Sequence, residues 1–149
     1  MKGVIALEGG LAGALALTLL HEVFRKIDPK APRMDLLGMN AISKTLRKAG
    51  ISPPPRTKLF YITMAGDIIS NALYYSMAIR GRKKMDIVRG LLLGSGAGLG
   101  ALLLPKPLQL NKAYTNRTTK TKVLTIALYI IGGVVAASVA SYLEKGKAL

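Results

Sequence analysis

The side chains of this sequence that could do chemistry are a few polar groups inside long apolar stretches. Glu8, Asp67 and Asn71 lie within such stretches, and His21 stands beside Glu22 near the end of the first one. A polar side chain surrounded by lipid is costly, so it is expected to face a partner or an aqueous cavity. These five positions are therefore the first candidates for function.

Asp67 carries the sharpest hypothesis, because it lies near the middle of its apolar stretch. Thr63, Asn71 and Tyr74 recur around it at three- and four-residue spacing, which gives one face of a helix a polar stripe. Such a stripe is typical of hydrogen bonding between membrane helices, and it is also typical of a proton- or cation-handling site. Both interpretations stay open.

The charges near the ends of the apolar stretches suggest ion pairs. Glu8 and Arg89 are expected at similar depth on one side, where a pair would fix the register of two helices or gate one side of a transporter. Glu22 has Arg25 one turn further along the same helix, close enough to neutralise it.

His21 is the only histidine, and the sequence contains no cysteine. A lone histidine at the end of a span is more often an interface residue than a ligand, and His21, Glu22 and Asp67 lack any recognised metal-ligand spacing. Phosphate-loop, nucleophile-elbow and paired-histidine motifs are missing. We therefore expect no metal, no cofactor and no enzyme activity; a lipid-acting enzyme using His21 and Glu22 at headgroup level is the third functional hypothesis.

The elements that must position these groups are membrane helices. Half of the 149 residues are hydrophobic, yet the formal net charge is +15, and the charges gather between apolar stretches. A bilayer core of about 30 Å requires about 20 helical residues. Four stretches qualify: residues 3–24, 59–79, 85–104 and 123–143. The sequence predicts one all-α domain over residues 1–149, a polytopic integral membrane protein with four transmembrane helices.

The first connection contains its own helical signal over residues 35–49, with Asp35 as the expected N-cap. Its apolar residues share one face and its lysines lie opposite, which predicts an amphipathic helix in the headgroup plane or, alternatively, against a partner protein. We expect the basic connections to bind membrane lipids with anionic headgroups. Nucleic-acid binding is not expected, because the basic residues are not interleaved with aromatic ones and no binding motif is present.

Small residues at four-residue spacing predict close helix packing, within one chain or between copies, because lipid offers little hydrophobic drive for association. The residues concerned are Gly9, Gly13, Gly90, Gly94, Gly98, Gly132, Gly133 and Ala137.

Two functional hypotheses lead. The first is a non-enzymatic structural or accessory subunit of a membrane assembly, either a homo-oligomer or a larger complex, because packing signals are strong and catalytic ones are missing. The second is a small proton or cation transporter or channel that uses Asp67 at mid-membrane. The excess of basic residues in the first and third connections places both termini outside the cytoplasm. The compact chain favours a bacterial inner membrane.

Overall fold

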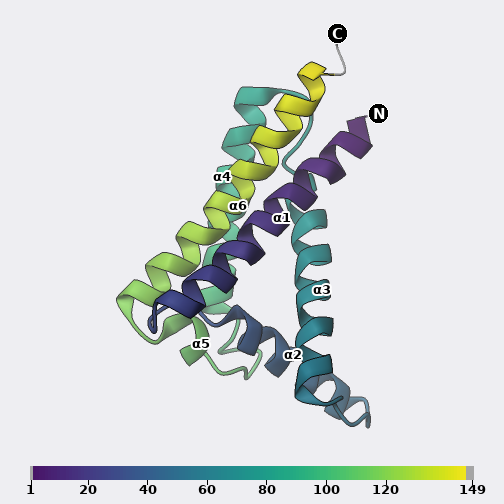
Figure 1. Ribbon diagram of the computed structural model, residues 1–149. Helices are drawn as coiled ribbons and strands as arrows, with labels where there is room; N and C mark the ends of the chain where they lie inside the picture. Colours follow the sequence, from purple (N-terminus) through teal and green to yellow (C-terminus); the bar gives the residue numbers. More distant parts are fainter. Residues whose placement is uncertain (1, 147–149) are drawn as a thin grey trace.

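The computed structural model describes residues 2–146, and within this range it consists of helices and connections without strands. The all-helical fold predicted from the sequence is thus confirmed. Figure 1 places both ends of the chain at one end of the molecule, here called the terminal end, and α2 and α5 at the other, here called the α2 end. The helices are α1 (Lys2–Ile27), α2 (Met34–Lys48), α3 (Arg56–Ser76), α4 (Lys83–Leu103), α5 (Ala113–Asn116) and α6 (Thr119–Gly146).

Within the described residues, three helices are long and apolar enough to cross a membrane: α1, α4 and α6. This composition indicates an integral membrane protein. The fourth predicted span forms a helix, α3, but it does not belong to this apolar set. Its sequence explains why, because Arg56 and Lys58 open the helix and Asp67 and Asn71 interrupt its apolar character.

The long helices pack as a row in the order α3, α1, α6, α4. Contacts run along α1 and α3, along α1 and α6, and along α6 and α4, whereas α3 and α4 hardly touch. Figure 1 accordingly shows α3 diverging from the other long helices toward the α2 end. The row therefore leaves one face between α3 and α4 without a helix.

Glycines lie where the neighbouring backbones come closest. A Cβ built at Gly94 would lie 2.6 Å from the Cα of Ile130, and one built at Gly98 would lie 2.7 Å from the Cα of Ile126. Gly90 and Gly133 face each other's backbones directly. The bare backbone of α4 thus allows α6 to approach at a distance that no larger residue permits.

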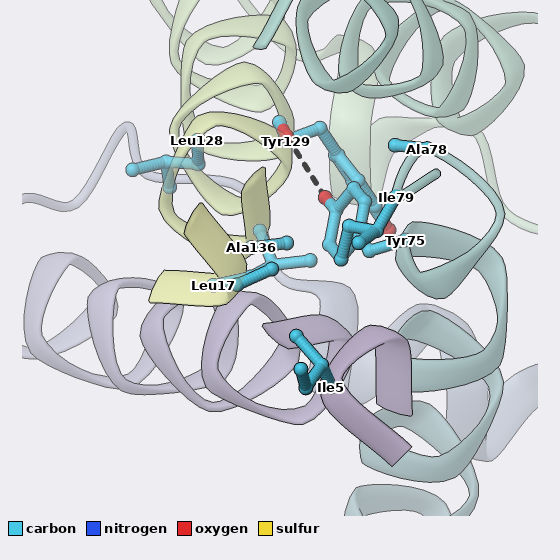
Figure 2. Close-up of a cluster of buried hydrophobic side chains, with 9 residues drawn as sticks. Ile5, Leu17, Tyr75, Ala78, Ile79, Leu128, Tyr129 and Ala136 are labelled. Atoms are coloured by element: carbon cyan, nitrogen blue, oxygen red, sulfur yellow. Dashed lines mark hydrogen bonds between the residues drawn. The ribbon is translucent and has the colours of Figure 1, made fainter. Parts of the chain in front are cut away.

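Tyr75 joins α3 to α6 in the core of the bundle. Its hydroxyl donates a hydrogen bond to the backbone oxygen of Tyr129 at 2.8 Å, and its side chain is fully buried. Figure 2 shows this bond beside Leu17 of α1 and Ala136 of α6. Gly132 leaves the space that the Tyr75 ring occupies. A single side chain therefore ties the most polar long helix to the most apolar one.

The helix predicted in the first connection exists as α2, but Asp35 is not its N-cap. The cap position is Arg33, without a side-chain cap bond, and Asp35 lies in the first turn. The reason is that the helix begins before Asp35, at Met34, and the Asp35 carboxylate accepts from the Arg33 guanidinium at 2.9 and 2.7 Å. Gly50, at a φ of 74°, follows the helix end. The placement of α2 at a membrane surface stays a prediction.

Candidate functional site

A cleft of about 770 Å³ lies between α3 and α4. This volume falls within the range of roughly 300–1,000 Å³ that is typical of small-molecule sites. One wall is the polar stripe of α3, and the opposite wall is the glycine- and alanine-rich face of α4. At the α2 end the cleft is bordered by α2 and by residues 105, 108 and 110, which follow α4. The residues that line the cleft include Gly38, Thr63, Gly66, Asp67, Ser70, Asn71, Tyr74, Gly96, Ala97 and Gly100.

Asp67 is held by hydrogen bonds from two helices. Asn71 Nδ2 donates to Asp67 Oδ1 at 2.9 Å and also to the Asp67 backbone oxygen, while Thr18 Oγ1 of α1 donates to Oδ2 at 3.2 Å. Each carboxylate oxygen thus accepts one side-chain hydrogen bond. The structure brings together Asp67 and Asn71, which the spacing had paired, and adds Thr18, which sequence reasoning missed. The available signal was that Thr18 precedes His21 by three residues and so shares its helix face.

His21 borders a small cavity of about 20 Å³ enclosed by α1, α2 and α3. Its Nε2 atom is buried and has no hydrogen-bond partner among residues 2–146, and its ring meets that of Tyr129 edge-on at 5.7 Å. A space of this size accommodates one water molecule, which needs about 10–15 Å³. Asp67 and Thr18 line the same cavity. The imidazole of His21 and the carboxylate of Asp67 therefore border one small space.

Two ion pairs lie between this cavity and the α2 end. Arg25 donates to Glu22 at 2.7 and 2.5 Å, the neutralising contact expected from their spacing, and Arg33 holds Asp35. Burial alone would raise the pKa of Asp35, but the hydrogen bonds and charge of Arg33 outweigh it and lower that pKa. Asp35 is therefore ionised at neutral pH, and Glu22 and Asp35 both line the cavity that His21 borders.

The cleft and the smaller cavities share wall residues. Asp67 and Thr63 line both the cleft and the His21 cavity, while Asp35 lines both that cavity and a third pocket of about 300 Å³. The third pocket carries Arg25, Arg33 and Arg56 and is here called the arginine pocket. Polar groups thus follow one another from the middle of α3 to the α2 end.

The remaining charged candidates lie at the terminal end. Arg89 donates to Asp86 at 2.9 Å, and Asp86 also accepts the backbone N–H groups of Gly81 and Arg82. Sequence reasoning missed Asp86, although its position in the first turn of a helix is the usual signal for such a role. Glu8 lies exposed on α1, and its pairing with Arg89 stays a prediction.

The chemistry of the site must be argued from this geometry. Across the part of the chain that the structure describes, no three histidine or carboxylate side chains gather as metal ligands, and His21, Glu22 and Asp67 do not form such a set. Comparisons of the chain with family models, with curated proteins and with solved structures gave no match.

Proposed function

We propose that this chain is a small membrane transporter that moves protons or cations through Asp67. One observation carries the proposal: Asp67 lines both an open cleft at the middle of α3 and the enclosed cavity of His21. The hydrogen bond from Thr18 alone would be enough to join α1 to α3 through Asp67. The presence of the His21 imidazole on the same cavity is what favours a role in proton transfer. The second sequence hypothesis therefore receives more support than the first.

The proposal requires α3 to be a fourth span. At 21 residues α3 is about 32 Å long, enough for a bilayer core of about 30 Å. Its outward face carries exposed apolar side chains, among them Ile62, Ile69 and Leu73. Its polar stripe faces the cleft and α1 instead. A membrane helix that contacts lipid on one side and a polar site on the other is expected to have one apolar face and one polar face, as α3 does.

The named groups have distinct roles in this scheme. Asp67 binds and releases the proton or cation, while Thr18 and Asn71 orient its two oxygens. In this scheme a proton leaving Asp67 crosses the small cavity to the imidazole of His21, which lines it. From there the path to the α2 end runs past Glu22 and Asp35, each of which is paired with an arginine.

The test is a flux measurement on the purified chain in sealed vesicles with a pH-sensitive dye inside. We expect proton flux in the wild-type protein, and we expect Asp67→Asn to abolish it while preserving the hydrogen bond from Asn71. Asp28→Asn is the matched control, because Asp28 borders neither the cleft nor the His21 cavity. Flux that survives Asp67→Asn would remove the mechanism.

A second candidate is the non-enzymatic subunit of a homo-oligomer or larger membrane complex. The observation in its favour is that α3 and α4 hardly touch, which leaves a lateral opening that a neighbouring subunit can cover. Basic residues exposed on α2, such as Arg47 and Lys48, would then meet anionic headgroups. Native purification followed by mass spectrometry tests it, and a strictly monomeric protein that copurifies with nothing would contradict it.

A further inference from the structure

We propose that the cleft between α3 and α4 binds a single-chain lipophilic amine, with its ammonium group at Asp67 and its alkyl chain along the glycine wall of α4. The inference rests on the proposed transport function, since it names the class of cation that the same carboxylate would take. The length of the cleft, its glycines and its charge support this inference.

The length of the cleft fits a slender chain. Its polar wall runs from Thr63 to Tyr74, a helical rise of about 16 Å. An extended alkyl chain lying along this wall would have the Asp67 carboxylate within the same cleft.

The cleft glycines differ from the packing glycines of this protein. No atom comes within 4 Å of a Cβ built at Gly66, and the nearest atom to one built at Gly100 is Leu104 Cδ1 at 3.6 Å. At Gly96 the nearest atom is the Tyr74 hydroxyl, at 3.4 Å. A glycine inside a helix costs about 1 kcal/mol relative to alanine. At these three positions no neighbouring backbone requires that cost, and the bare walls leave room for a ligand chain to lie flat against them.

The charge of the cleft selects a cation. Asp67 is the only carboxylate among its lining residues, and that lining contains no lysine, arginine or histidine in the described structure. Each Asp67 oxygen accepts one side-chain hydrogen bond and has further acceptor capacity, and the Ser70 and Thr63 hydroxyl oxygens lie on the same wall. An ammonium head finds an acceptor set there, while a fatty acid would place a second carboxylate beside the first.

The experiment measures binding of three probes of equal chain length to the full protein in lipid nanodiscs: octadecylamine, octadecanol and octadecanoic acid. We expect octadecylamine to bind the wild-type protein at least about tenfold more tightly than either of the others, because only it forms a charge-assisted hydrogen bond with Asp67. Asp67→Asn should remove this preference. Gly100→Leu should block binding by filling the cleft, whereas Gly3→Leu, also in open space but outside the cleft, should not.

Equal binding of the three probes, or amine binding that survives both Asp67→Asn and Gly100→Leu, would overturn the assignment. Gly66→Leu fills the cleft from the opposite wall and keeps the test valid if the Gly100 variant fails to fold. Amine binding without proton or cation flux would refute the transport function and leave the cleft assignment standing. Flux that depends on Asp67 without amine binding would refute the cleft assignment alone. If the protein instead formed dimers and bound none of the probes, a second copy of the chain would be the occupant of the cleft. This result would also refute the amine assignment.

Discussion

Asp35 is the carboxylate outside the apolar helices that is held most firmly, because Arg33 donates to both of its oxygens and its side chain is only 5% exposed. Breaking this partly buried pair by Asp35→Asn should lower the free energy of unfolding by about 2 kcal/mol at pH 7. The folded-state pKa of Asp35 is below its unfolded value of about 3.9. The pair therefore stabilises fully above that unfolded value, and its contribution is lost as pH falls through the lower folded pKa.

Denaturant unfolding of both proteins at neutral and acidic pH checks this prediction by circular dichroism. The difference between wild type and Asp35→Asn should shrink toward zero in strong acid. A difference that stays constant with pH would show that the carboxylate charge is not what stabilises the fold. Asp28→Asn is the comparison variant, since the hydrogen bond from Lys120 lowers the pKa of that carboxylate, and its cost should be smaller than that of Asp35→Asn.

For individual residues, the pairs that lie within one helix could be predicted from their spacing, whereas the contacts between helices could not. The Asp67 and Asn71 pair and the Glu22 and Arg25 pair follow from residues three or four apart. Thr18 reaches Asp67 only because α1 packs on α3. Likewise, the edge-on contact of His21 with Tyr129 depends on the position of α6.

Among the elements, α3 and α4 together contain glycines of two kinds, and exchanging them for alanine should have opposite effects. Gly94→Ala places a methyl group 2.6 Å from the Cα of Ile130, so α4 and α6 must separate, at a cost of about 1–3 kcal/mol. Gly66→Ala, on α3, meets nothing within 4 Å and should stabilise the protein by up to about 1 kcal/mol through helix propensity. Unfolding curves in mixed micelles measure both changes, and equal destabilisation by the two would contradict the distinction.

The helices themselves were largely predictable, but their arrangement was not. Apolar length located all four long helices, and the observed α6, Thr119–Gly146, extends past the expected 123–143 because polar and small residues continue the helix beyond its apolar segment. Small-residue spacing occurs on α1, α4 and α6 alike, so it does not reveal which pairs meet. The row order, and with it the cleft between α3 and α4, depends on contacts such as Tyr75 with Gly132.

For the whole molecule, the two ends are tied in different ways. At the α2 end, the first connection is joined to the start of α6 and to the residues just before it. The bonds are those of Arg117 to the Pro29 backbone oxygen, of Thr121 to the Lys30 backbone oxygen and of Lys120 to Asp28. At the terminal end, Asp86 holds the turn between α3 and α4. Along the cleft itself, the Tyr74 hydroxyl of α3 donates a hydrogen bond to the Leu93 backbone oxygen of α4 at 3.0 Å. The ties at the two ends do not close the rest of its lateral face.

The same arrangement predicts on which side of the membrane each connection lies. If α3 crosses the bilayer, Ser52 before it and Arg82 after it must lie on opposite sides, whereas a surface-bound α3 would leave them on the same side. The sequence has no cysteine, so Ser52→Cys and Arg82→Cys each supply a single reactive thiol. A membrane-impermeant maleimide applied to sealed, uniformly oriented vesicles should label only one of the two, and detergent should expose the other. Gly3→Cys should match Arg82→Cys, because α1 begins at the end where α4 begins (Figure 1). Labelling of Ser52→Cys and Arg82→Cys from the same side would reduce the protein to the three apolar spans and remove Asp67 from the middle of the membrane.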